Sequence, residues 1–138
     1  ADFGPVLQEK ISTALLRNPQ ANGMALSYDD LVTAGGAAAV MASGRNDSLE
    51  VVSGSGYAAN IDLVRKNKGQ DAGWTYDGAY EAWSAADMIN RYFAGEESVP
   101  SGVGISMFDH DNDLPPEGEA WSTGIEYEPI FKKVWGVS

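Results

Sequence analysis

A repeated order of strand, turn and helix limits the possible folds of this 138-residue chain more than any other property of its sequence. Short apolar runs typical of buried strands alternate with amphipathic runs of helical spacing. The predicted strands cover residues 23–27, 49–52 and 72–75, and the helices that follow them cover 31–43, 57–67 and 79–93. Successive strands joined by helices pair in parallel, with right-handed crossovers. The sequence therefore predicts an α/β fold of three layers, with helices on both faces of a mainly parallel sheet.

Two of the predicted helices carry a clear apolar stripe. The first helix is expected to begin near Pro5 and to end at Asn18-Pro19. Its predicted buried residues are Val6, Leu7, Ile11, Ala14 and Leu15. The helix over 79–93 is expected to end at Gly95. Its predicted buried residues are Ala79, Trp83, Ala86, Ile89 and Phe93.

The last third of the chain has weaker patterns. Val103, Ile105 and Met107 alternate with small residues and predict a further strand. Residues 109–126 are acidic and proline-rich, so we expect a surface loop there. A short helix is expected to begin near Pro129. Residues 1–138 are therefore predicted to form a single α/β domain that contains this loop.

The charge of the chain argues against partners that carry phosphate groups. It has 20 acidic and 9 basic residues, a formal net charge of -11, which repels nucleic acid and anionic lipid surfaces. The absence of cysteine excludes disulfides, thiolate zinc sites and cysteine nucleophiles. No apolar run approaches the ~20 residues that cross a bilayer, so we expect neither nucleic-acid binding nor membrane insertion.

The first residues are neither an initiator Met nor a signal peptide. We therefore expect the chain to be a processed or truncated piece of a longer protein.

The predicted topology locates a binding site. Ligands of open parallel sheets bind outside the carboxyl ends of the strands. Three loops lie there, at residues 27–30, 53–56 and 75–78. The candidate ligand contacts in or beside them are Tyr28, Asp29, Ser55, Trp74, Tyr76 and Asp77. Aromatic faces stack on sugar rings or apolar ligands, and tyrosine hydroxyls add hydrogen bonds. Asp77 is the weaker candidate, because a helix cap also explains it.

Other chemistry is less well supported by the residues. Gly54 and Gly56 precede a helix and could offer N–H groups to an anion, but the turn lacks the glycine and lysine patterns of nucleotide sites. A plain tight turn is therefore favoured there. His110 is the sole histidine, no Gly-x-Ser-x-Gly elbow exists, and we expect that histidine to face solvent. The sequence predicts no catalytic residue, no cofactor and no enzymatic activity.

The acidic loop resembles a metal site only in its first half. Asp109, Asp111 and Asp113 alternate as in a calcium loop. Leu114 stands where such a loop has its turn glycine, and Ala120 where it has its bidentate Glu. An enzyme that uses this loop with calcium is the weakest of the functional hypotheses, and we predict no metal site.

Four stretches, taken in order, resemble a known family. Residues 18–30 (NPQANGMALSYDD) are similar to its NP-x-I-x-G-V-F-A-x-N-D stretch. Residues 49–56 (LEVVSGSG) resemble I-x-V-V-G-x-D-G, and residues 72–78 resemble A-T-V-x-Q-x-P. Residues 93–100 resemble L-x-G-x-x-V-P. Over nearly its whole length, the chain thus resembles the type I periplasmic sugar-binding proteins of ABC transporters.

The resemblance implies a Rossmann-like lobe of a two-lobed clamp that closes on a small sugar or related metabolite. It implies an extracytoplasmic location in bacteria, in the periplasm or lipid-anchored at the cell surface, and delivery of the ligand to an ABC permease. The chain would supply most of the C-terminal lobe, and the N-terminal lobe would be missing from it. The same type of lobe occurs in the effector domains of LacI-like transcription regulators, which is the alternative function.

Three positions depart from the family pattern. Tyr28 stands where the family has an amide, Ser55 where it has a sugar-binding aspartate, and Tyr76 where it has glutamine. Two amides are thus replaced by phenols, and a carboxylate that would form charge-assisted hydrogen bonds is replaced by a hydroxyl. We expect a less hydroxyl-rich ligand or one with a stacked ring.

Overall fold

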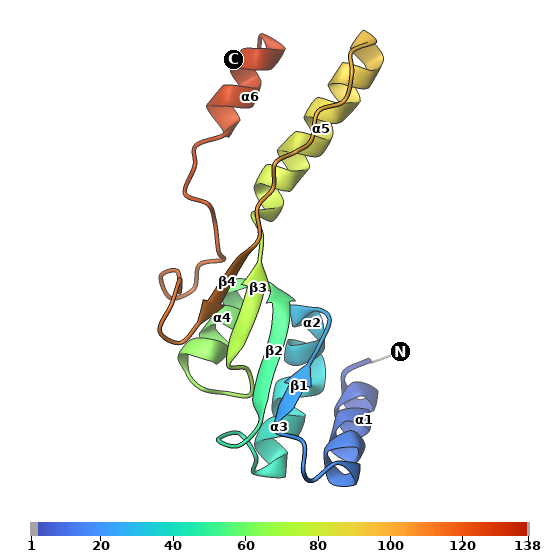
Figure 1. Cartoon of the computed structure of the whole chain (residues 1–138), viewed down its shortest axis with the longest axis vertical. Coiled ribbons are helices and arrows are strands. Elements are labelled where there is room, and N and C mark those ends of the chain that lie inside the picture. Colours follow the sequence, from blue (N-terminus) through green and yellow to red (C-terminus); the bar gives the residue numbers. More distant parts are fainter. Residues whose placement is uncertain (1–2, 138) are drawn as a thin grey trace. The chain divides into compact units, whose positions relative to one another are not determined.

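The computed structural model describes residues 3–137, which divide into two compact units. The elements are α1 (Phe3–Arg17), β1 (Gly23–Ala25), α2 (Asp29–Leu31), η1 (Val32–Gly36), α3 (Ala37–Ser43), β2 (Glu50–Ser55), α4 (Ala58–Arg65), β3 (Ala72–Thr75), α5 (Gly78–Ala94), β4 (Ser106–Asp109) and α6 (Glu128–Trp135) (Figure 1). Unit 1 is Ala1–Thr75 with Ser106–Trp121, and unit 2 is Tyr76–Ile105 with Ser122–Ser138. The single domain expected over residues 1–138 stays a prediction.

Unit 1 contains the sheet, whose strands lie in the order β1-β2-β3-β4. β1 and β3 both pair with β2 in parallel, and β4 pairs with β3 antiparallel. The register places Ser55 opposite Thr75, so β2 and β3 end side by side. The predicted α/β fold with a mainly parallel sheet is confirmed.

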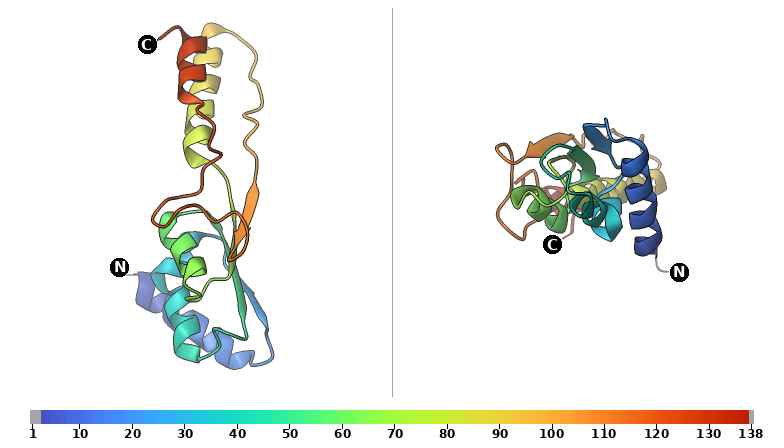
Figure 2. Two further views of the ribbon diagram at one scale, coloured as in Figure 1. Left: turned by 90° about the vertical axis from the view of Figure 1, so that its left-hand side faces the viewer. Right: turned by 90° about the horizontal axis from the view of Figure 1, so that it is seen from below.

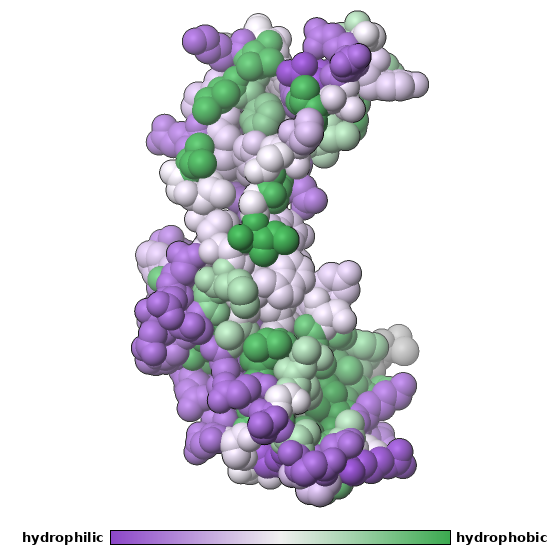
Figure 3. All heavy atoms as spheres, viewed as in Figure 1, coloured by the Kyte–Doolittle hydropathy of each residue, from purple (hydrophilic) through white to green (hydrophobic). Residues whose placement is uncertain are grey.

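The core of unit 1 lies between one face of the sheet and the helices. Figure 2 shows α1, α3 and α4 on the same side of the strands. One apolar cluster joins Ile11 and Leu15 of α1 to Val51 of β2. Ile11 and Leu15 are buried as predicted, whereas the burial predicted for Val6 and Ala14 is wrong, because both are exposed. A second cluster joins α4 to Phe108 of β4. Among the described residues of unit 1, no helix covers the other face (Figure 2). Val52 and Met107 are exposed at 41% and 70%, and Figure 3 shows hydrophobic side chains at the surface of unit 1.

Helix ends in the structure follow the sequence signals. Gly44 and Gly95 have φ of 69° and 72° and end α3 and α5 in the left-handed conformation that glycine adopts without strain. The guanidinium of Arg45 donates hydrogen bonds to the carbonyls of Leu15 and Asn18 at the end of α1. A positive charge there also complements the helix dipole.

The helix predicted over 31–43 is split into three parts. η1 is a π-helical turn that contains Gly35 and Gly36. A Cβ atom at Gly35 would lie 2.8 Å from the carbonyl oxygen of Gly4 in α1. The close approach of α1 therefore requires glycine at this point of the helix.

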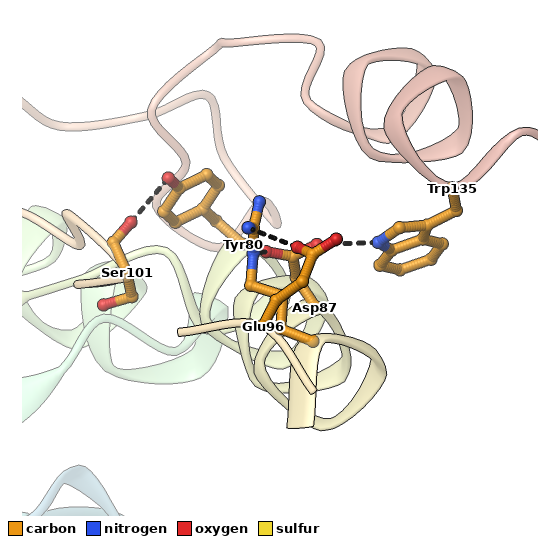
Figure 4. A network of polar contacts seen from close by, with 6 residues as sticks. Tyr80, Asp87, Glu96, Ser101 and Trp135 are labelled. Atoms are coloured by element: carbon orange, nitrogen blue, oxygen red, sulfur yellow. Dashed lines mark hydrogen bonds and ion pairs between the residues drawn. The ribbon is translucent and has the colours of Figure 1, made fainter. Parts of the chain in front are cut away.

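Unit 2 consists of α5, α6 and the segments that lead into and out of them. The rings of Trp83 and Trp135 are stacked with centroids 5.3 Å apart, and those of Tyr80 and Tyr127 meet edge-on at 5.2 Å. Asp87 accepts hydrogen bonds from Trp135 Nε1 at 2.8 Å and Arg91 Nε at 2.7 Å (Figure 4). These contacts hold α6 against α5.

Two expectations for this region are wrong. Ala79, Ile89 and Phe93 were predicted to be buried, but all three are exposed, Ile89 and Phe93 at 57% and 81%. Ile89 and Phe93 are uncovered because α6 packs on the other side of α5. The strand predicted from Val103 begins only at Ser106, since no strand among the described residues pairs with Val103–Ile105.

We predict that Gly73→Ala destabilises unit 1 by about 1–3 kcal/mol, because overpacking forces a buried neighbour to move. A Cβ atom there would lie 2.6 Å from Cε1 of Phe108, which is fully buried. Urea unfolding followed by circular dichroism measures the change. Gly23→Ala is the control, since its Cβ would have ordinary contacts only; equal stability of both variants would contradict this packing.

Candidate functional site

The loops that follow β1 and β2 are joined by one buried carboxylate. Oδ2 of Asp29 accepts hydrogen bonds from the backbone N–H groups of Gly56 at 2.9 Å and Tyr57 at 3.1 Å. Asp29 itself is completely buried. Since Ser55 lies opposite Thr75, the carboxyl ends of β1, β2 and β3 form one rim in unit 1. We call Tyr28, Asp29, Ser55, Gly56, Tyr57 and Thr75 the rim.

Asp29 occupies the position at which an external anion would bind. The N–H groups of Gly56 and Tyr57 precede α4 and would form the anion-binding end of that helix. Both donate to the Asp29 carboxylate instead. The tight turn favoured for residues 53–56 is wrong, because β2 continues to Ser55 and Gly54 pairs with Trp74 in the sheet.

A buried polar layer supports the rim from below. Asn60 Nδ2 donates to the backbone oxygen of Asp29 at 3.1 Å and to Oε1 of Gln70 at 2.9 Å. Gln70 Nε2 donates to the Ala72 carbonyl at the start of β3. Neither Asn60 nor Gln70 was predicted from the sequence to belong to the site. Asn60 could have been identified from the sequence, because it is a polar residue one turn before Val64 and lies on the buried side of the same helix.

Ser55 has an unusual backbone at the end of β2. Its φ is 147°, in a region that residues other than glycine seldom adopt. Such a conformation costs on the order of 1–3 kcal/mol and is often retained at functional sites. The Thr75 hydroxyl donates to the carbonyl oxygen of Ser55 at 3.2 Å and helps to hold it.

The aromatic candidates of unit 1 differ in exposure. Tyr28 is 60% exposed and stands at the start of α2. Trp74 is half-buried and points away from α4, because side chains alternate along β3 and a Cβ atom at the neighbouring Gly73 would meet Phe108, which packs against α4. Its indole fills the space in which a side chain at Gly54 would lie. Glycine at position 54 is therefore required by the ring of Trp74.

The two remaining candidates belong to unit 2. Tyr76 is half-buried, and Asp77 is almost completely buried. One oxygen of Asp77 accepts the Tyr80 N–H at 2.9 Å, and so caps α5. The other accepts the Thr123 N–H and the Ser122 hydroxyl, both at 3.1 Å. The capping role considered for Asp77 is confirmed, and ligand contact by any of the six candidates stays a prediction.

The pKa of Asp77 is lowered by these donors. Burial acts to raise it, but hydrogen bonds from the N–H groups of Tyr80 and Thr123 outweigh burial, so the pKa lies below the usual 3.8. Burial and the nearby Asp77 carboxylate raise the pKa of the Tyr127 phenol. Asp77 therefore stays ionised at neutral pH.

The acidic loop uses its carboxylates in its own turn. Oδ1 of Asp109 accepts the N–H groups of Asp111 and Asn112. Asp113 accepts hydrogen bonds from Ser106 and Trp121. Residues 3–137 contain no group of three histidine or acidic side chains that could hold a metal ion. His110 is exposed, as expected.

No helix in the described part of the chain has the length and apolar character of a transmembrane segment.

No family model and no curated protein matches this sequence, whereas its fold matches several solved structures. One is an ABC transporter periplasmic solute-binding protein from Actinobacillus succinogenes 130z with bound D-allose, at TM-score 0.66 and 20% identity. Another is an ABC transporter solute-binding protein from Mycobacterium smegmatis with bound glycerol, at TM-score 0.69 and 17% identity. A third, from Agrobacterium vitis with bound α-D-tagatopyranose, has TM-score 0.66 and 18% identity.

These similarities show that the chain has the fold of ABC transporter solute-binding proteins. The matches cover 76%, 88% and 83% of this chain, but only 36%, 43% and 38% of the three neighbours. The chain therefore spans about two fifths of the proteins that it resembles.

We predict that Asp29→Ala destabilises unit 1 by about 2–4 kcal/mol, because it leaves two buried N–H groups without an acceptor. Asp29→Asn keeps one acceptor oxygen and should cost less. The neighbouring Asp30 is exposed, so Asp30→Ala should change stability by less than about 0.5 kcal/mol. Urea unfolding compares the three variants, and equal effects at positions 29 and 30 would contradict a structural role for Asp29.

The lowered pKa of Asp77 predicts that unit 2 loses stability in acid. A group whose pKa is lowered in the folded state stabilises that state above its unfolded pKa, and the contribution disappears as the pH falls through the folded pKa. The loss is therefore expected below about pH 3.8. Near-ultraviolet circular dichroism of the stacked tryptophans between pH 6 and 2 should follow it. Asp77→Asn should weaken this dependence, whereas Glu81→Gln should leave it intact.

Proposed function

We propose that this chain is part of the extracytoplasmic solute-binding component of an ABC transporter, and that it binds a small sugar or sugar-like ligand at the rim. The observation that carries the proposal is the Asp29 carboxylate, which joins the loops after β1 and β2. Ligands of parallel sheets bind outside the carboxyl ends of the strands. The solute-binding proteins that share the fold contain bound D-allose, glycerol and α-D-tagatopyranose.

The residues proposed to contact the ligand are mainly aromatic or neutral. Tyr28 offers an exposed phenol, and Ser55 offers a hydroxyl at a strained backbone position. Tyr76 and Trp74 add aromatic rings. The carboxylates of Asp29 and Asp77 already accept internal hydrogen bonds, so we assign them to holding the loops in place. This set suits a ligand with one ring face and few hydroxyl groups.

The mechanism that we propose is closure of two lobes around the ligand, followed by delivery to a permease. A ligand that contacts both lobes favours the closed state by the difference between its affinities for the two states. The unmatched length of the solved neighbours supports the presence of a second lobe in the complete protein.

A thermal-shift screen tests this proposal on the longest polypeptide that the gene encodes around this sequence. The ligands are D-allose, D-tagatose, glycerol and a panel of pentoses and deoxy-sugars. A ligand present at 100 times its Kd should add about 2.7 kcal/mol to the free energy of unfolding. Tyr28→Ala should remove the shift without changing the stability of the free protein. A folded protein that none of these ligands stabilises would contradict the proposal.

A substitution at Ser55 should change ligand affinity and the stability of the free protein in opposite directions. Ser55→Gly relieves the backbone conformation at φ 147°, so we predict a gain of about 1 kcal/mol in the free protein. The same variant should weaken ligand binding, because it removes the hydroxyl. Asn67 also has positive φ but lies beyond the end of α4, away from the rim. Asn67→Gly is therefore the control, and calorimetry should find its ligand affinity unchanged; unchanged affinity in Ser55→Gly would exclude this serine from the site.

A further inference from the structure

A small apolar hollow lies in unit 1, away from the rim. It is bounded by the C-terminal parts of α1 and α3, the helices that end just before β1 and β2 begin (Figure 1). The hollow is thus at the amino ends of these strands, whereas the rim is formed by their carboxyl ends. Its volume of about 310 Å³ is near the lower end of the range for small-molecule sites. Its apolar walls are Leu15, Leu16, Pro19, Ala39 and Ala42.

A single cation, and no carboxylate, lines this hollow. Arg45 is half-buried there, and its terminal nitrogens donate to the backbone carbonyls of Leu15, Asn18 and Ala21. These carbonyls hold the guanidinium in place, but they carry no net charge. Among the described residues, no carboxylate forms an ion pair with Arg45. The positive charge in the hollow therefore lacks a counter-charge.

The other basic side chains of similar burial are different in this respect. Arg65, Arg91 and Lys132 are also half-buried, and each has a carboxylate within 4 Å. A basic side chain that is partly removed from water is stabilised by such a partner. Arg45 is the half-buried basic residue of the described chain that has none, and an anion at the hollow would supply the missing partner.

Two hydrogen-bond donors of the hollow remain available. Residues 3–137 provide no acceptor for Nε of Arg45 or for the hydroxyl of Ser12. The hydroxyl of Ser43 is different, because it already donates to the Val40 carbonyl at 2.7 Å. A carboxylate accepts hydrogen bonds from guanidinium and hydroxyl groups, and the bond to the guanidinium is strengthened by charge. The hollow thus combines apolar walls with donors that suit a carboxylate.

We propose that this hollow binds a small monocarboxylate with an apolar tail, such as a medium-chain fatty acid. The carboxylate would accept hydrogen bonds from Nε of Arg45 and from Ser12, and the tail would cover Leu16, which is 82% exposed. A doubly charged phosphate is disfavoured, because a single guanidinium would leave one of its charges unpaired. A hollow of this size takes a small molecule and not several residues of a peptide. The site is separate from the rim and does not depend on sugar binding there.

Calorimetry with octanoate tests the proposal on the longest polypeptide that the gene encodes around this sequence. Octanoate should bind at one site with a Kd below about 1 mM, an affinity within reach of a ligand of this size. 1-Octanol, which has the same tail and no charge, should bind at least about tenfold more weakly. An acetylated tetrapeptide that ends in leucine examines the rival occupant. The absence of saturable octanoate binding, equal affinity for octanol, or tighter binding of the peptide would each overturn the proposal.

Matched variants locate the bound octanoate. Arg45→Gln should weaken binding at least about tenfold, whereas Arg17→Gln, which removes the same charge from an exposed position of α1 outside the hollow, should leave it unchanged. Because Arg45 also holds the end of α1, a second pair of variants fills the hollow and keeps the guanidinium. Ala42→Phe should abolish binding, and Ala38→Phe, at an exposed position one turn earlier, should not. Equal effects of the two variants in either pair would overturn the proposal.

Hydrogen exchange distinguishes this hollow from the rim. Octanoate should slow the exchange of amides between Leu15 and Ala21, at the end of α1, and leave the loops around Tyr28 and Ser55 unchanged. Slower exchange of the rim loops in place of the end of α1 would show that octanoate occupies the site proposed for the sugar, and would overturn the inference. A protein that binds octanoate at α1 but no sugar would contradict only the proposed function.

Discussion

A buried carboxylate at the start of α2 holds the loops of the sheet edge together. Oδ2 of Asp29 accepts hydrogen bonds from the backbone N–H groups of Gly56 and Tyr57, which lie just before α4. The dipole of α4 also favours a negative charge at this end of the helix. A buried charge that lost these donors would be strongly destabilising. The loops after β1 and β2 are therefore expected to move as one body, so any closure around a ligand has to occur elsewhere in the protein.

The sequence predicted those parts of the fold that depend on neighbouring residues. The strand over 72–75 has the observed bounds, and the glycines at 44 and 95 end helices as expected. The partner of Asp29 was not predictable in this way, because Gly56 lies 27 residues further along the chain. A single aspartate after a strand is equally compatible with a ligand contact, a helix cap and an internal anion. Only the distances between loops distinguish these roles.

The wrong prediction for Ile89 and Phe93 has a different cause. The periodicity identified a real apolar face of α5, but periodicity does not say which polypeptide covers that face. In the described chain α6 covers the opposite side through Trp83 and Trp135. The same reasoning applies to Val103–Ile105, which has a strand-like sequence but lacks a neighbouring strand among residues 3–137. Sequence patterns thus identify apolar faces and strand-like segments, but they do not identify the residues that pack against them.

The two aspartates that follow β1 and β3 both accept hydrogen bonds from nearby backbone and hold neighbouring segments together, each within its own unit. Asp29 accepts N–H groups of the adjacent loop, and Asp77 accepts N–H groups of α5 and of the returning chain at Thr123. Oδ2 of Asp29 and both oxygens of Asp77 are thus occupied by internal donors. Recognition at the proposed site would then depend on phenols, a hydroxyl and ring faces. Such neutral groups favour an uncharged ligand, because burying an ion beside them would leave its charge unpaired.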